Sequence, residues 1–170
     1  MAKARTASST HKRAAVSLFE GPVEQGYVNP STLGKSDAVE LLTREGEHKA
    51  IKTGEVKAVY FVKEFTAVPE PERKTFLSRP KLDGLWVRLR FRDNDELEGV
   101  VSNDLLDLLD GGVRLTPPDL HGNCLWVFIP REALAEMKVL GVVGIARRPA
   151  REKPAATAQG TDAQAKLFGE

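Results

Sequence analysis

The stretch VRLRFRDNDELEGVV at residues 87–101 decides how the chain is expected to fold. Its first part alternates valine, leucine and phenylalanine with three arginines, a period of two that predicts a strand with one buried face. The acidic turn at 93–95 interrupts the strand. Residues 97–101 then predict a second strand, bent at Gly99, because glycine in a strand interior marks sharp bends.

The same order recurs earlier in the chain. Residues 16–28, VSLFEGPVEQGYV, predict a strand, a turn and a strand that contains Gly26. Each pair of strands is followed by three further strand segments, near residues 39–43, 51 and 56–62 in the first half and 113–116, 127–129 and 137–140 in the second. A short helical turn at 52–55 precedes the last strand of the first half, and a longer helical segment at 130–136 precedes that of the second. The sequence therefore predicts an internal duplication with five strands per unit.

Short strands with frequent turns favour an all-β fold built from two tandem five-stranded small barrels. The tails lack hydrophobic periodicity and are expected to be disordered. The expected organisation is a disordered basic arm at 1–13, a first barrel at 14–65, a linker at 66–84, a second barrel at 85–145 and a disordered tail at 146–170.

The net charge of +1 hides an uneven distribution. Residues 14–145 contain 16 lysines and arginines against 21 acidic residues, whereas the two tails contain 9 against 3. No apolar run is long enough to span a bilayer, and the single cysteine, Cys124, forms no disulfide within the chain. We therefore expect a cytoplasmic protein with no membrane partner.

The arrangement of strands resembles Sm-like and SH3-like small barrels, in which a short helical turn precedes the last of five bent strands. At the level of whole segments the chain also resembles an uncharacterised bacterial family of tandem small barrels. The segments that carry this second resemblance are GYVNP at 26–30, VKAVYFV at 56–62, RPKLDGLWVR at 79–88 and LGVVG at 140–144. The resemblance implies a fold and brings no activity with it.

Two departures limit what the resemblances imply. RNA binders of the Sm type share a stacking residue with asparagine in one loop and a basic residue with glycine in another, and neither unit reproduces that pair. Ring assembly and uridine binding are thus not implied. A likeness to PilZ domains, which bind cyclic di-GMP, is weaker, because Ser102 precedes the acidic residues of its segment and the arginines at 88, 90 and 92 are not four apart.

The candidate ligand-binding residues are five basic side chains: Arg79, Lys81, Arg88, Arg90 and Arg92. The last three project from one face of a strand, where guanidinium groups can clamp phosphates or an acidic partner. The alternative is that Glu96 and Glu98 on the next strand neutralise them. The linker is interpreted either as a basic binding loop or as a tether that seats Phe76 and Leu77 between the barrels.

The sequence gives little indication of metal binding, base stacking or catalysis. Four aspartates near His121 suggest a metal, but the leucines between them fit a helical turn packed on the barrel. Two tryptophans and Tyr60 are expected in packing rather than in base stacking. No nucleophile elbow, phosphate-cradling loop or nucleotide fingerprint is present. We therefore expect no enzyme activity, no cofactor and no metal.

Two functions of different classes remain. The first is a non-enzymatic interaction or regulatory module with a protein partner, which the acidic body favours. The second is nucleic-acid binding of the Sm-like kind, assisted by the basic tails; cyclic di-GMP binding ranks below both. A homo-oligomer formed through open barrel edges is a further expectation, because an unpaired edge invites a second copy.

Overall fold

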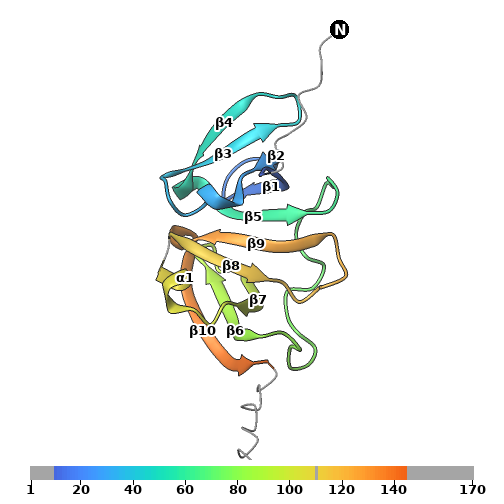
Figure 1. The fold of residues 1–170 in the computed structure, drawn as a ribbon, viewed down its shortest axis with the longest axis vertical. Coiled ribbons are helices and arrows are strands. Elements are labelled where there is room, and N and C mark those ends of the chain that lie inside the picture. The colour runs from blue at the N-terminus through green and yellow to red at the C-terminus, as the bar shows by residue number, and fades with distance from the viewer. Residues whose placement is uncertain (1–9, 110, 145–170) are drawn as a thin grey trace, which may run out of the picture.

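The computed structural model describes residues 10–109 and 111–144, so the tails predicted to be disordered lie outside the described residues except at 10–13. The described chain forms strands, one short α-helix and three 3-10 turns, at Pro30–Thr32, Thr53–Glu55 and Arg131–Ala133 (Figure 1). The elements are β1 (Lys12–Leu18), β2 (Glu24–Val28), β3 (Ala38–Thr43), β4 (His48–Lys52), β5 (Val56–Val62), β6 (Gly84–Phe91), β7 (Glu96–Val101), α1 (Leu105–Leu109), β8 (Gly112–Thr116), β9 (Cys124–Pro130) and β10 (Leu134–Val143). Because β1 begins at Lys12, it includes two residues of the predicted arm.

The strands form one antiparallel sheet in the order β10-β6-β7-β8-β9-β5-β1-β2-β3-β4. The all-β prediction is confirmed. The sheet is continuous from β10 to β4, and among the described residues these two end strands pair with no further strand. The finer prediction of two separate five-stranded barrels is therefore not confirmed.

Both halves of the sheet use the same neighbour order. Counted from the first strand of each half, the order is fifth, first, second, third, fourth, because β5 lies beside β1 and β10 lies beside β6. The register agrees as well, since Gly26 of β2 pairs with buried Ala14 and Gly99 of β7 pairs with buried Val87. The two halves therefore share a strand order and this glycine position.

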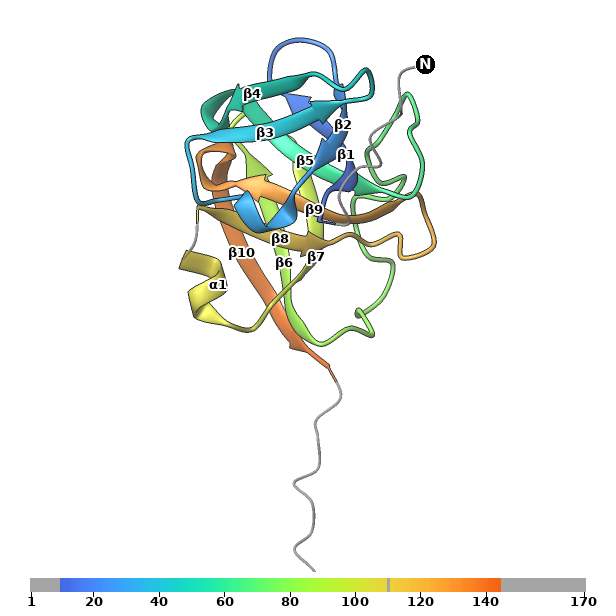
Figure 2. The ribbon, with the colours of Figure 1, turned by 45° about the horizontal axis from the view of Figure 1, so that its top comes forward.

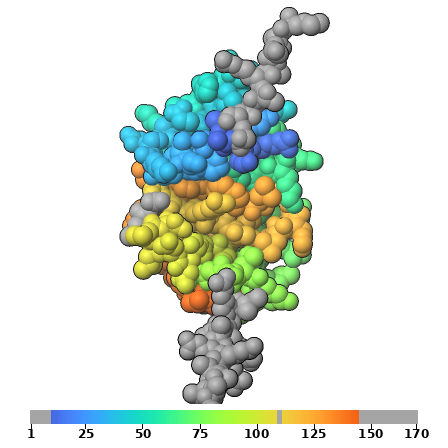
Figure 3. All heavy atoms as spheres, in the orientation of Figure 1, coloured from blue at the N-terminus to red at the C-terminus, as the bar shows by residue number. Residues whose placement is uncertain are grey.

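The halves meet where β5 pairs with β9, a contact that we call the joint. Side chains of β5 alternate between two cores: Val59 and Phe61 pack in the core of the first half, whereas Tyr60 packs in the core of the second. Phe128 of β9 reaches in the other direction, into the first core. Both faces of the joint therefore carry buried side chains, and Figure 3 shows the two halves stacked along the long axis without separation.

The segment before β10 differs from expectation. A helix was expected at 130–136, but the structure has a 3-10 turn at Arg131–Ala133 and then β10. Pairing along β6 and burial of Ala133 outweigh the helix propensity of this alanine- and glutamate-rich segment. The predicted leucine-rich turn is present as α1, in which Leu108 packs on the second core while Leu105 and Leu106 are exposed.

The linker is fastened to the second half. The Phe76 ring lies edge-on to the Trp86 ring at 6.2 Å between centroids, whereas Leu77 is 83% exposed and not seated between the halves. An ion-pair network joins the linker to both halves. Lys57 of β5 pairs with Asp93 and Asp95 in the turn between β6 and β7, and Lys74 of the linker pairs with Asp95. No helix among the described residues has the length and apolar character that crossing a membrane requires.

Candidate functional site

Arg88, one of the residues predicted to bind a ligand, is engaged by a buried carboxylate. Its Nε and Nη2 atoms donate to Glu98 at 3.1 and 2.7 Å. Glu98 is only 3% exposed and also accepts from the Phe76 backbone N–H and the Trp86 indole. Burial by itself raises the pKa of Glu98, but these hydrogen bonds hold it below its ordinary value. The pair therefore fixes the linker to β6 and β7.

The other predicted residues are directed to different parts of the protein. Arg90 donates to Glu136 of β10 at 3.4 Å, and Arg92 donates to the Gly54 carbonyl at 2.7 Å. Arg92 also covers the Phe19 ring at 3.8 Å, and Arg79 donates to the carbonyl of Val142. Lys81 is exposed on the linker. The structure thus does not bring these side chains to one groove, and a ligand site at them stays a prediction.

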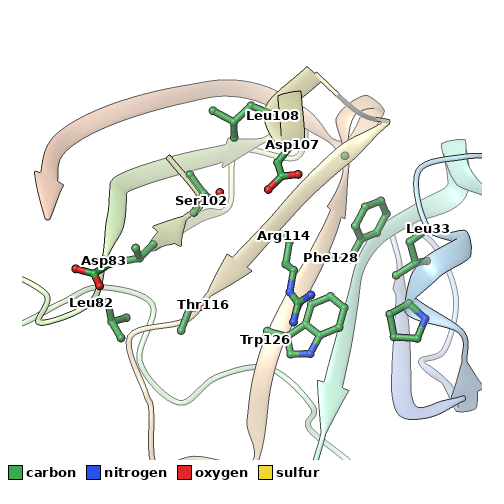
Figure 4. A pocket seen from close by; sticks show the side chains of 14 residues that line it. Leu33, Leu82, Asp83, Ser102, Asp107, Leu108, Arg114, Thr116, Trp126 and Phe128 are labelled. Atoms are coloured by element: carbon green, nitrogen blue, oxygen red, sulfur yellow. The ribbon is translucent and has the colours of Figure 1, made fainter. Parts of the chain in front are cut away.

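A different set of side chains converges at the joint. The Trp126 ring of β9 is stacked on the Phe61 ring of β5, with centroids 3.8 Å apart and planes inclined by 9°. On Trp126 lies the guanidinium of Arg114 from β8, whose Cζ is 3.9 Å from the ring centroid. Figure 4 shows Arg114 directed along the Trp126 ring, across from Leu33 of the first half. Trp126 is half-buried and Arg114 is exposed.

Two cavities flank this Phe61–Trp126–Arg114 stack. Both are lined by Pro30, Arg114 and Trp126, so together they form one groove that crosses the joint, which we call the joint groove. The cavity toward β6, β7 and α1 has a volume of about 410 Å³, and the cavity toward the start of β1 has a volume of about 590 Å³.

The charges in the groove are distributed unequally. In the larger cavity every charged side chain among the described lining residues is basic: Lys12, Arg13, Lys63 and Arg114. The carboxylates of Asp83 and Asp107 line only the smaller cavity, on the far side of Arg114 in Figure 4. This basic cluster lies on a body in which acidic residues are in excess.

Local structure holds the basic residues in place. Lys12 and Arg13 begin β1 and Lys63 follows β5, and because these strands are antiparallel neighbours the three residues lie at the same end of the sheet. The Arg13 Nη1 donates to the Lys63 carbonyl at 2.6 Å. Arg114 lies between Val113 and Leu115 of β8, which are both buried, and its own side chain is exposed.

Sequence reasoning missed this cluster. Arg114 is a solitary arginine that alternates with apolar residues, and Lys12 and Arg13 lie in the predicted arm at 1–13. A sequence signal did exist, because residues 56–62 and 124–130 are nearly continuous apolar runs instead of alternating ones. Such runs are typical of strands that are buried on both faces and point to the position of the joint.

Metal and nucleophile chemistry has little support in the described residues. No group of three or more histidine, cysteine or carboxylate side chains at 10–109 and 111–144 is arranged to hold a metal ion. The Asp104 carboxylate accepts from the Leu106 N–H at the start of α1, and Asp110 lies outside the described residues. Burial raises the pKa of the Cys124 thiol to about 12, so it stays protonated at neutral pH.

A comparison with protein-family models places these features in context. The model of a family described as "Family of unknown function (DUF6982)" matches residues 10–141, which include all strands up to most of β10. No curated protein and no solved structure matches the chain. The matched segment is well over half of the sequence, and the chain therefore belongs to this family of unknown function.

Proposed function

We propose that the protein is a non-enzymatic, bacterial cytoplasmic binding module whose joint groove binds single-stranded nucleic acid. The observation that carries the proposal is Arg114, an exposed arginine whose guanidinium lies over the Trp126 ring without a carboxylate partner among the described residues. This reverses the order that the sequence favoured, in which a protein partner came first.

Arg114 offers a surface on which a base can stack. Its guanidinium lies over the Trp126 ring, with the Cζ atom 3.9 Å from the ring centroid, and Arg114 lines both cavities of the groove. Bases splayed out of single strands stack on aromatic rings and equally on arginine planes. Phe61 occupies the second face of Trp126, so in this proposal the two rings support the arginine and Arg114 contacts the base. The support fixes the guanidinium before the ligand arrives, which lowers the entropic cost of binding.

The basic cluster supplies partners for the phosphates. Lys12, Arg13 and Lys63 line the same cavity as Arg114, so a strand whose base lies on Arg114 can pass its backbone over them. The acidic excess of the body repels phosphates elsewhere and favours this position. If all four side chains replace counterions on a single strand, the logarithm of the binding constant falls with the logarithm of salt concentration with a slope of about −2.8.

The geometry favours a single strand over a duplex. In a duplex the bases are stacked on one another and paired, so a side chain that lies at the joint has no base face to contact. Cavities of about 410 and 590 Å³ match one or two extruded nucleotides better than a double helix.

The experiment is fluorescence anisotropy with labelled ten-nucleotide single strands of RNA and DNA, and with a duplex of the same length, across salt concentrations. We expect the full chain to bind single strands, and Arg114→Ala to weaken binding about tenfold because a stacked base contributes roughly 1–3 kcal/mol. Arg114→Lys keeps the charge and removes the planar guanidinium, so its affinity for single strands stays well below that of the wild type.

Arg131→Ala, at an exposed arginine outside the joint groove, is the matched control and is expected to bind normally. Absence of binding at low salt, or an equal loss in the control, removes the proposal. Cyclic di-GMP serves as a competitor: if it binds and the oligonucleotides do not, the groove belongs to a dinucleotide ligand instead.

A protein partner remains the second candidate. The observation in its favour is the exposed apolar edge of β10, where Met137, Val139 and Val142 are 37%, 55% and 61% exposed. We also propose, from the strand order shared by the two halves, that the chain arose by duplication of one Sm-like or SH3-like unit.

A further inference from the structure

The second core is not fully covered at the outer edge of β10. Among residues 10–109 and 111–144, β10 pairs only with β6 and ends the sheet. Met137 and Val139 lie opposite Leu89 and Val87, and residues directly opposite in an antiparallel pair point to the same face. Leu89 and Val87 are fully buried, yet their partners on β10 are 37% and 55% exposed. Core-facing apolar side chains are thus left uncovered at this edge.

The opposite end of the sheet has different chemistry. On β4 the residues His48, Lys49 and Lys52 are exposed, and lysines on an edge strand discourage further pairing. β10 carries one lysine, Lys138, whose Nζ lies 3.4 Å from the Glu136 carboxylate of the same strand. The two ends of the sheet are therefore not equally suited to receive another strand.

We propose that two copies of the chain pair antiparallel through β10, about a twofold axis that passes beside Met137. In this register Met137 faces Met137 of the second copy. Glu136 and Lys138 flank Met137, so each glutamate faces the lysine of the other copy. Strand edges give the backbone hydrogen bonds, and these two reciprocal ion pairs fix the register. This inference does not depend on the joint groove.

The free part of the edge contains the three residues that this register pairs. The carbonyl of Val142 already accepts from Arg79, and the β10–β6 pairing is irregular between Leu134 and Glu136 and again between Val139 and Gly141. The regular stretch 136–139 lies between these irregularities and contains Glu136, Met137 and Lys138. Beside it, Met137, Leu134 and the α1 residue Leu108 line a cavity of about 310 Å³, against which apolar side chains of the second copy can pack. Figures 1 and 2 both show α1 lying beside β10.

The alternative arrangement, in which β10 of one copy pairs with β4 of another as β5 pairs with β9 within the chain, is disfavoured. Counted from the 3-10 turn that separates the last two strands of each half, Lys138 corresponds to Tyr60 and Lys49 corresponds to Val127. Tyr60 and Val127 face each other in the joint, so a head-to-tail contact of β10 with β4 places two lysines opposite each other. Like charges in that position are destabilising, which leaves the twofold arrangement.

Sedimentation equilibrium of the full chain, from low to high micromolar concentration, tests the proposal. We expect a dimer that the single variants Glu136→Lys and Lys138→Glu weaken at least tenfold, because each places like charges opposite each other across the axis. The double variant exchanges the two charges and restores the opposite pairs, so its dimer returns to near wild-type strength.

Lys52→Glu on β4 is the matched control and leaves the dimer unchanged, while thermal melts confirm that every variant is folded. A wild-type monomer at all concentrations overturns the proposal. So does a dimer that ignores both single reversals, a double variant that fails to recover, or an open series of oligomers that responds to Lys52→Glu.

Discussion

At Gly26 and Gly99 the absence of a side chain lets a neighbouring strand approach closely. A Cβ at Gly26 would collide with the Leu42 carbonyl oxygen, and a Cβ at Gly99 would collide with the side chain of Leu115. Leu115 is fully buried, so it has no free space into which to move. The sequence identified both glycines as bends, and the structure adds that both are sites of close approach.

We expect Gly26→Ala and Gly99→Ala each to lower the free energy of unfolding by about 1–3 kcal/mol, because an added methyl group overpacks the site. The loss should be larger at Gly26, where the obstacle is backbone. Gly141→Ala in β10 is the control, since nothing lies within 4 Å of its Cβ position. Urea denaturation measures all three, and equal values for Gly99→Ala and Gly141→Ala would contradict the packing argument.

At the scale of elements, the sequence predicted every strand near its observed position because local periodicity and turn residues determine them. It did not predict the single sheet, since pairing of β5 with β9 joins residues that are more than 60 positions apart. It also missed Arg114, because that residue gains its setting only when β8 and β9 place it on Trp126. Arg90 and Arg92 were visible in the sequence as candidates, but their partners Glu136 and Gly54 come from distant segments.

The joint strands couple the two halves, so a change in one of them should be felt in both. Val127 of β9 is fully buried, and Val127→Ala is expected to cost about 2 kcal/mol. Hydrogen exchange should then show amides of β2 and β7 losing protection together. Val23→Ala, at a residue that is 38% exposed, serves as the control. It should lower the free energy of unfolding by less than about 0.5 kcal/mol. Loss of protection in the second half alone would show that the halves open separately.

At the scale of the whole molecule, carboxylates in the turn between β6 and β7 tie three segments together. Burial by itself raises the pKa values of Asp93 and Asp95, but hydrogen bonds from Lys57, and for Asp95 also from Lys74, hold both below the ordinary value. The folded chain therefore binds fewer protons than the unfolded chain in acid. Its stabilisation by these groups is complete above the unfolded pKa of about 4 and is lost as the pH falls through the folded values.

We expect Asp95→Asn to lower the free energy of unfolding at pH 7 by about 0.5–1 kcal/mol, the range for partly exposed ion pairs. Below pH 4 the difference from the wild type should shrink, because the wild-type carboxylate becomes protonated there too. Denaturant titrations from pH 2 to 7 measure this, with Glu45→Gln in an exposed turn as the control. If the difference in free energy of unfolding between variant and wild type stays constant across this range, the network does not contribute to the loss of stability in acid.

The double burial of the joint has a historical consequence. If the halves began as copies of one unit, each ancestral unit had strands with a solvent face, as β3 still has. Once Tyr60 and Phe128 had moved into each other's cores, neither half could be lost or transplanted without exposing large apolar side chains of the other. On the proposed duplication, the pair is inherited as one unit from that point, which accords with a family match that runs across both halves.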